Sequence, residues 1–244
     1  QEGLLRMLEN TLSNGERPED LVIYAGSLVP EALLAWTRPG TPAVDSASLT
    51  LEEIVSAMAD AHRAGQRVVR LHTGDPSLYG AVFEQIAEIY KLGIPFRVIP
   101  GVTAAFAAAA AMGIEYTLPE ISQTLILTRV AGRTPVPESE SLASLAAHRA
   151  SMAIYLSMGQ IGAVADILGQ AYGADAPCAV VYRASQPDEK VIRTQVRELA
   201  ARVRAEGITR QALIIVGRVL EVGLEDLKIT SKLYDKNFEH GFRS

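Results

Sequence analysis

Residues 68–80 decide the fold, and they read Val-Val-Arg-Leu-His-Thr-Gly-Asp-Pro-Ser-Leu-Tyr-Gly. The run Val68–Thr73 is mostly apolar and is typical of a strand largely buried in a parallel sheet. Ligands of open α/β sheets bind beyond the carboxyl ends of the strands, and Gly74 would let a ligand approach the backbone closely. Asp75 could accept hydrogen bonds from such a ligand, or it could simply cap the following helix. The loop alone leaves both interpretations open.

The same alternation of strand and helix extends on both sides of this stretch. Thr50 and Glu53 have the spacing of a capping box, apolar residues follow at helical intervals, and Gly65 can end that helix. We expect strands at Leu21–Gly26, Val68–Thr73 and Phe96–Pro100, and further helices at Tyr79–Lys91 and Thr103–Met112. This pattern predicts a parallel, doubly wound layer.

The second half of the chain predicts a different, mixed sheet. Two of its strands flank Gln186–Glu189 closely enough to form a hairpin. Pro119 interrupts the helical pattern, so we expect an α/β fold with an N-terminal domain at 1–118 and a C-terminal domain at 119–244. The strands expected in the second domain are Thr124–Arg129, Ala153–Ser157, Cys178–Ala184, Lys190–Val196 and Ala212–Val219, and its helices are Ser141–His148, Ile161–Tyr172 and Arg197–Glu206.

Composition excludes several classes of protein. The 244 residues carry a formal net charge of −5, which argues against a nucleic-acid surface. The longest uncharged run, Val98–Ile114, is short for a membrane span and contains Pro100 and Gly101. The chain opens without a signal-peptide pattern, and its single cysteine, Cys178, allows no internal disulfide, so we expect a cytoplasmic protein.

The sequence predicts neither a metal site nor a catalytic nucleophile. The four histidines are scattered without the spacing of metal ligands, and Cys178 lies in an apolar run that is typical of a core strand. No Gly-x-Ser-x-Gly elbow or Walker loop is present. A catalytic residue is therefore not identified.

Three other loops are candidates for binding. Thr103, after Pro100-Gly101-Val102, could cap a helix or face a ligand, and Gly26-Ser27 could be a plain turn or face a cleft. Gly132–Pro137 is rich in proline, lacks apolar periodicity and is expected to be an exposed loop over a cleft.

Taken together, these segments resemble the precorrin-4 or cobalt-precorrin-4 C11-methyltransferases of the tetrapyrrole methyltransferase superfamily. The Gly-Asp-Pro and Pro-Gly-Val-Thr segments are shared by the wider superfamily. The Tyr-Ala-Gly-Ser-Leu-Val segment, the Gly-Arg-Thr-Pro-Val-Pro loop and the C-terminal tail are more specific to C11 methylation. The segments that carry the resemblance are 24–29 (Tyr-Ala-Gly-Ser-Leu-Val), 71–80, 99–104 (Ile-Pro-Gly-Val-Thr-Ala), 123–129, 132–137 (Gly-Arg-Thr-Pro-Val-Pro), 181–190, 231–235 and 240–243.

The resemblance implies a two-domain fold, a homodimer and S-adenosylmethionine folded into a cleft between the domains. It also implies methyl transfer to C11 of an anionic tetrapyrrole in cobalamin biosynthesis. The cofactor contacts carried over by position are Thr73, Gly74, Asp75, Leu78, Thr103, Ala104, Leu156, Ala184 and Gly217. The substrate contacts suggested by their place in the matching segments are Tyr24, Ser27, Arg129, Arg133 and Arg183.

This chemistry agrees with the residues found. Methyl transfer from a sulfonium mainly requires donor and acceptor to be held in line, and the electron-rich ring carbon is itself the nucleophile. The carboxylates of the substrate need cationic partners, and arginine can bind each of them through two hydrogen bonds. The three arginines could equally be solvated surface residues.

The first 19 residues depart from the family pattern. The family opens with a strand and a Gly-x-Gly-Pro-Gly-Asp-type loop beneath the cofactor, whereas residues 1–14 predict a helix that ends at Gly15. On this basis the chain is expected to bind S-adenosylmethionine weakly. Two alternatives stay open: a relative that binds tetrapyrrole or cofactor without catalysis, and a methyltransferase with another acceptor.

Overall fold

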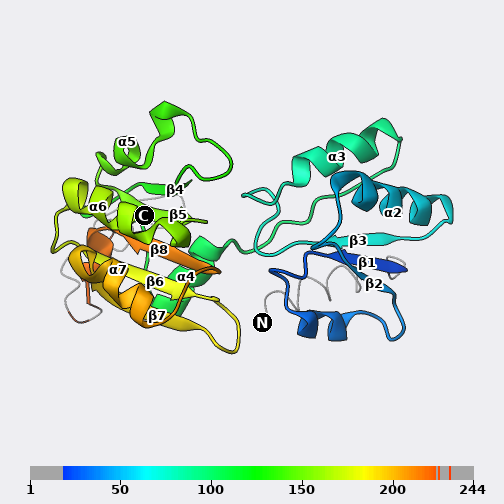
Figure 1. Cartoon of the computed structure of the whole chain (residues 1–244). Helices are drawn as coiled ribbons and strands as arrows, with labels where there is room; N and C mark the ends of the chain where they lie inside the picture. Colours follow the sequence, from blue (N-terminus) through cyan, green and yellow to red (C-terminus); the bar gives the residue numbers. More distant parts are fainter. Residues whose placement is uncertain (1–18, 224, 226–230, 232–244) are drawn as a thin grey trace, which may run out of the picture. The chain divides into compact units, whose positions relative to one another are not determined.

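The computed structural model describes residues 19–223, 225 and 231 (Figure 1). The helix predicted for residues 1–14 lies outside the described residues, as does nearly all of the C-terminal motif. The chain divides into two compact units, 1–103 and 104–244, which are described separately.

Unit 1 contains a parallel sheet of three strands in the order β2-β1-β3. Two helices cover one face of this sheet, and a 3-10 helix lies on the other side (Figure 1). Ile23 of the sheet packs against Ile54, Met58 and Ile89, which belong to the two helices. The elements are β1 (Leu21–Tyr24), η1 (Glu31–Trp36), β2 (Ala43–Asp45), α2 (Leu51–Arg63), β3 (Val68–Leu71) and α3 (Val82–Lys91).

The capping box predicted at the start of α2 is confirmed. The Glu53 amide donates to the Thr50 hydroxyl at 3.3 Å, and the Thr50 amide donates to the Glu53 carboxylate at 2.7 Å. These two bonds satisfy backbone donors that the first turn of a helix leaves unpaired. The buried residues of the helix are Ile54, Met58 and Ala61, in the predicted apolar pattern.

Two expectations for unit 1 are wrong. Phe96–Pro100 is not a strand: among the described residues β3 pairs with β1, and the 96–100 segment has no ladder partner. An apolar run cannot become a strand without a neighbouring strand to accept its backbone hydrogen bonds. The helix expected from Tyr79 begins only at Val82, because Tyr79 and Ala81 adopt φ values of 56° and 47° that a right-handed helix excludes.

Unit 2 contains a mixed sheet of five strands in the order β4-β5-β8-β6-β7. β4 and β5 are parallel, and the other neighbours are antiparallel. The predicted hairpin is confirmed as the pair β6–β7. The elements are α4 (Ala104–Met112), β4 (Leu125–Arg129), η2 (Glu138–Glu140), α5 (Leu142–Ala146), β5 (Ser151–Tyr155), η3 (Met158–Gln160), α6 (Ile161–Tyr172), β6 (Pro177–Tyr182), β7 (Lys190–Gln195), α7 (Val196–Ala205), β8 (Ala212–Val216) and η4 (Arg218–Glu221).

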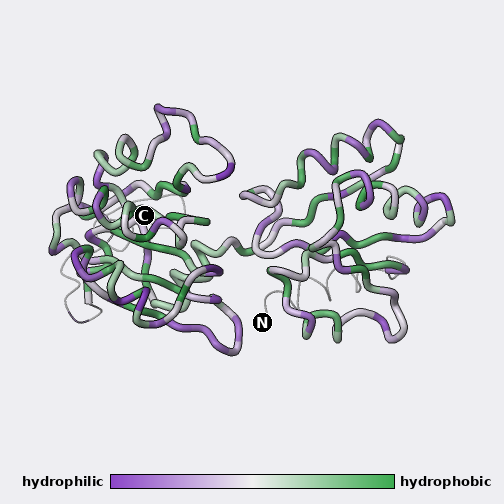
Figure 2. The backbone as a smooth tube through the Cα atoms, in the orientation of Figure 1, coloured by the Kyte–Doolittle hydropathy of each residue, from purple (hydrophilic) through white to green (hydrophobic). Residues whose placement is uncertain are grey.

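Both faces of the unit 2 sheet are covered. Alternate residues such as Ile154 and Ile214 pack against α5, α6 and α7, while Ala153 and Ile215 pack against α4. The strands are accordingly among the most hydrophobic parts of the backbone in Figure 2. Cys178 is a buried residue of β6, as expected, and burial raises the pKa of its thiol to about 12.

The two units divide earlier than the boundary expected near Leu118. The reason is α4, whose Ala105, Ala108 and Ala109 belong to the apolar cluster of the unit 2 sheet. Across the described residues, no helix is long and apolar enough to cross a membrane.

Candidate functional site

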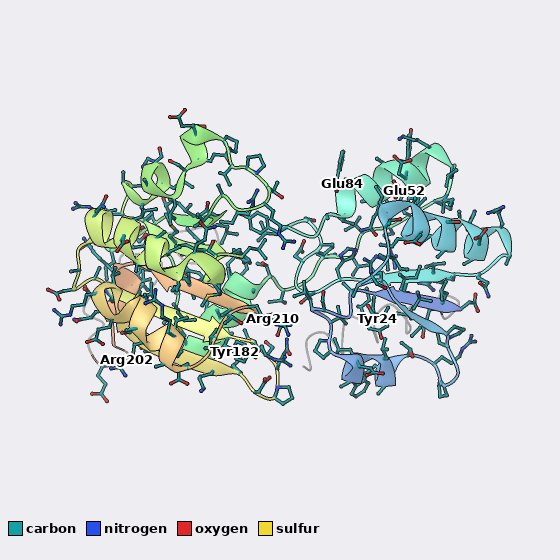
Figure 3. The ribbon with its side chains drawn as sticks, viewed as in Figure 1. Tyr24, Glu52, Glu84, Tyr182, Arg202 and Arg210 are labelled. Carbon is teal, nitrogen blue, oxygen red and sulfur yellow. The ribbon has the colours of Figure 1, made fainter. Side chains whose placement is uncertain are left out.

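The carboxyl ends of the three parallel strands lie at one edge of the unit 1 sheet. This edge carries the segment after Tyr24, the end of β2 at Asp45, and the loop that follows β3. Figure 3 labels Tyr24, the last residue of β1. Of the predicted site residues, the structure thus brings Tyr24, Ser27, Thr73, Gly74, Asp75 and Leu78 to this edge or to the loops beyond it.

Asp75 joins two of these loops. One carboxylate oxygen accepts the Ser77 amide at 2.8 Å, and the other accepts the Gly101 amide at 2.8 Å. These two bonds hold the pKa of Asp75 below its usual value, the Gly101 bond more strongly. The residue before α3 is Ala81, so Asp75 is not the cap of that helix. Its carboxylate ties the Gly74 loop to the Pro100-Gly101 segment.

Gly101 is required by this close approach. A Cβ atom at Gly101 would overlap the carbonyl oxygen of Gly74, whose own φ is 62°. The bare backbone at both positions therefore allows the two loops to lie against each other. Thr103 is buried and directly precedes α4.

The loop after β1 is held by a residue that the sequence did not single out. The Asp45 carboxylate accepts the Gly26 amide at 2.9 Å and the Ala47 amide at 2.8 Å. A Cβ atom at Gly26 would overlap that carboxylate. Burial, with the charges of Asp45 and Glu31, raises the pKa of Tyr24. Asp45 ends a short strand without an apolar pattern, so its place at this edge had no sequence signal.

His72 is neutral at physiological pH. Burial and the charge of Arg70 lower its pKa to about 4. Arg70 is fixed beside it: its Nε donates to Gln85 at 2.9 Å and its Nη1 donates to the Ile23 carbonyl at 3.1 Å. Just before the Gly74 loop, Arg70 is therefore held by hydrogen bonds, and His72 is partly buried beside it.

A second edge is formed in unit 2 by the carboxyl ends of β4, β5 and β6, which run in the same direction. Arg129, Leu156, Arg183 and Ala184 lie at or just beyond these ends. β8 runs in the opposite direction, so Gly217 lies at the far edge, against the Ser151 backbone. The separation is about five residues of strand, or roughly 16 Å. The structure thus does not bring Gly217 together with Leu156 and Ala184.

Leu156 combines an unusual backbone conformation with an exposed apolar side chain. It follows β5 with a φ of 51°, and 70% of its surface is exposed although it is a large apolar residue. The neighbouring Ser157 is buried and bridges two strand ends, accepting the Val130 amide at 3.0 Å and donating to the Tyr155 carbonyl at 2.6 Å. The Tyr155 hydroxyl accepts the Ala105 amide at 2.9 Å, in the first turn of α4. A rigid neighbourhood therefore presents an exposed apolar side chain.

Five of the eight non-glycine residues with a left-handed backbone conformation in the described part of the chain follow the strand ends at these two edges. Outside glycine such conformations are uncommon, and they often mark functional sites because surrounding structure must enforce them. Those that follow the carboxyl ends of β3, β5 and β6 are Tyr79, Ala81, Leu156, Arg183 and Ser185.

The three predicted substrate arginines differ in their surroundings. The Nε of Arg183 lies 2.8 Å from Asp188, its Nη1 donates to Gln211 at 3.2 Å, and its guanidinium lies 5.9 Å from the ring centre of Tyr182. Both Nη atoms of Arg129 donate to backbone carbonyls of the 130–135 segment. Arg133 is exposed in the loop, as predicted for Gly132–Pro137. The direct contacts of all three with substrate stay predictions.

Residues 19–200 match the family of tetrapyrrole (corrin/porphyrin) methylases. The chain belongs to the tetrapyrrole methylase family. It is 50% identical to the cobalt-precorrin-4 C(11)-methyltransferase of Methanocaldococcus jannaschii, with 92% of this chain and 86% of the relative covered. It is 49% identical to the precorrin-4 C(11)-methyltransferase of Pseudomonas aeruginosa, with 91% and 88% covered.

Solved structures agree with this assignment. The X-ray structure of a cobalt precorrin-4 methyltransferase matches with a TM-score of 0.81 at 43% identity, covering 88% of this chain and 87% of that one. A uroporphyrin-III C-methyltransferase from Thermus thermophilus, complexed with S-adenosyl homocysteine, matches with a TM-score of 0.68 at 26% identity, covering 91% and 93%. The predicted family and the pairing of a parallel sheet with a mixed sheet are confirmed, and with them a methyltransferase that uses S-adenosylmethionine.

Proposed function

We propose that this protein transfers the methyl group of S-adenosylmethionine to C11 of precorrin-4 or cobalt-precorrin-4 in cobalamin biosynthesis. The observation that carries the proposal is the level of identity. C(11)-methyltransferases match this chain at 43–50% over most of its length, whereas a siroheme synthase matches at 31%. From the same resemblance we infer a homodimer and a cytoplasmic location.

Residues at each of the two edges offer groups that fit part of the methyl donor chemically. S-Adenosylmethionine has an adenine that needs apolar contact, and hydroxyl, amino and carboxylate groups that need hydrogen bonds. Leu156 offers an exposed apolar surface, and Thr73 offers an exposed hydroxyl beside the bare backbone of Gly74. The proposed cofactor contacts are Thr73, Gly74, Leu78, Thr103, Ala104, Leu156 and Ala184, with Asp75 holding its loop.

Catalysis by these residues would consist of binding and alignment. The sulfonium of the bound donor supplies an activated methyl group. The protein then has to fix the ring carbon in line with that group and exclude water, which can account for much of a rate enhancement. Tyr24, Ser27, Arg133 and Arg183 are the proposed substrate contacts. Arginine suits the peripheral carboxylates of a reduced tetrapyrrole because it binds each through two hydrogen bonds.

The test is incubation with precorrin-4, or with its cobalt form, and isotope-labelled S-adenosylmethionine. Mass analysis and product NMR should show one labelled methyl group at C11. A label at another ring carbon would indicate a methyltransferase with a different acceptor. Binding of donor and tetrapyrrole without any labelled product would indicate a non-catalytic relative.

A further inference from the structure

Side chains from outside the Gly132–Pro137 loop hold the segment 131–135, which includes the first part of this loop, at both ends. On one side, the Nη1 of Arg129 donates to the Thr134 carbonyl at 3.0 Å and its Nη2 donates to the Pro135 carbonyl at 2.9 Å. On the other side, the Nε2 of Gln160 donates to the Ala131 carbonyl at 2.7 Å. Arg129 ends β4 and Gln160 ends η3, so both donors stand on the scaffold of unit 2.

Arg133 lies between these two anchor points. The Gly132 amide donates to the Thr134 carbonyl at 3.2 Å, which closes the tip of the loop around Arg133. Residues 131–135 are all exposed, and water can satisfy the backbone carbonyls of an exposed loop without help from side chains. The Arg129 guanidinium has the geometry to bind a carboxylate through both Nη atoms, yet here both are directed at the loop. Two side chains, Arg129 and Gln160, are therefore used to hold an exposed loop.

We propose that Arg129 and Gln160 are positioning residues, which hold the 131–135 loop so that Arg133 meets a carboxylate of the tetrapyrrole. This proposal rests on the proposed function, since it assigns a role in substrate recognition at the same site. Holding the loop beforehand lowers the entropy lost when substrate orders Arg133. Arg129 acts through Arg133 and is not itself the group that meets the substrate.

The hydrogen bonds from Arg129 and Gln160 to the loop, called the clamp from here on, can be tested without an activity assay. Gln160→Glu keeps the size of the side chain but removes the N–H donor, and Gln170→Glu, at an exposed position of α6, is the matched control. Trypsin can cut after Arg133, because Thr134 follows it. We expect cleavage there to be several-fold faster in Gln160→Glu and in Arg129→Lys than in the wild type or the control. Equal cleavage rates in all four proteins would overturn the clamp.

The link to substrate is tested by a double-mutant cycle. Gln160→Glu alone and Arg133→Ala alone should each raise the substrate KM by about 3–10-fold, while the Kd for S-adenosylmethionine measured by calorimetry stays unchanged. If Gln160 acts through Arg133, the double variant should be no worse than Arg133→Ala. Additive effects on KM, or a changed cofactor Kd, would contradict the proposal.

Arg129→Lys separates positioning from direct binding. It keeps the charge but loses the planar fork that reaches two carbonyls. A positioning role predicts a raised KM that disappears in the Arg133→Ala background. A direct contact between residue 129 and substrate predicts a further loss in that background and would overturn the assignment. If no tetrapyrrole is a substrate but cleavage after Arg133 still accelerates, the proposed function fails while the clamp itself is retained.

Discussion

Each unit contains a sheet with proposed binding loops at one edge, but the two sheets differ in how much of their structure is buried. In unit 2, residues 152–154 of β5 and 213–216 of β8 are fully or almost fully buried between helices on both faces. In unit 1, all four residues of β3 are only half-buried, and the described core is a small cluster around Ile23. The loops of unit 2 therefore stand on a closely packed scaffold. Those of unit 1 depend more on hydrogen bonds made by the loops themselves.

The largest expected effect compares the two cores directly. Ile214 and Ile23 are both fully buried. Ile214→Ala should lower the free energy of unfolding by about 4 kcal/mol, because closely packed neighbours on both sides leave a cavity that cannot collapse. Ile23→Ala should cost about 2 kcal/mol, because partly exposed neighbours such as Leu21 and Val44 can move into the gap.

Urea denaturation of both variants and the wild type, followed by circular dichroism, measures these losses. Equal losses would mean that the unit 1 core is as rigid as that of unit 2. The contrast between the units would then be limited to their size.

The contact between the loops of unit 1 is tested by Gly101→Ala. Its Cβ would overlap the Gly74 carbonyl, so the two loops must separate. We expect a loss of about 1–3 kcal/mol in stability, typical of overpacking, and at least about tenfold weaker binding of S-adenosylmethionine. The control is Gly159→Ala in unit 2, where a Cβ atom would have open space. Wild-type cofactor binding in Gly101→Ala, measured by calorimetry, would show that this contact is not needed for the site.

Asp75→Ala removes the hydrogen bond that joins the Gly74 loop to Gly101 and the one to Ser77 within the loop. We expect about tenfold weaker binding of S-adenosylmethionine and a stability loss of about 1 kcal/mol, the usual net contribution of a hydrogen bond. Asp75→Asn keeps one acceptor oxygen and should give an intermediate result. Asp166→Asn, an exposed carboxylate on α6, is the control.

The pH dependence of Asp75 has a definite sign. Its folded pKa is lowered, so the carboxylate stabilises the fold above its unfolded pKa, and this contribution is lost as the pH falls through the folded value. For each Asp75 variant, calorimetry measures the affinity for S-adenosylmethionine, and a thermal melt measures the stability. A large drop in melting temperature with unchanged cofactor affinity would make Asp75 a purely structural residue.

What the sequence predicted correctly depends on local patterns. The capping box of α2 involves residues three apart, and the β6–β7 hairpin involves a short turn between two strand patterns. Phe96–Pro100 failed because strand formation depends on a distant partner that an apolar run does not specify. The sequence did not show that Gly217 lies at the opposite edge of the sheet from Leu156, because the direction of β8 is set by its pairing with β5 and β6.

The candidate site was predicted in the same uneven way. The loops themselves could be found from their small residues and the family resemblance. The side chains that hold them could not, because Asp45 and Gln160 become neighbours of the loops only through tertiary structure. Arg129 was singled out for its charge, whereas the structure directs that charge at backbone carbonyls.

The smallest expected effect concerns His72, at the base of the Gly74 loop. Its folded pKa is about 4, below the unfolded value near 6.5, because of burial and the charge of Arg70. Above pH 6.5 the ring is neutral in both states and has no effect on pH dependence. Between 6.5 and 4 the unfolded chain binds a proton that the folded chain excludes, so stability falls as the pH falls.

His72→Gln removes this titration with little change in size. Between pH 7.5 and 5 the wild type should lose about 1 kcal/mol more unfolding free energy than the variant, a value reduced for partial solvent screening. His148→Gln, at an exposed position of unit 2, should follow the wild type. Urea titrations at the two pH values measure the difference. If His72→Gln instead follows the wild type, the acid sensitivity of the protein does not originate in His72.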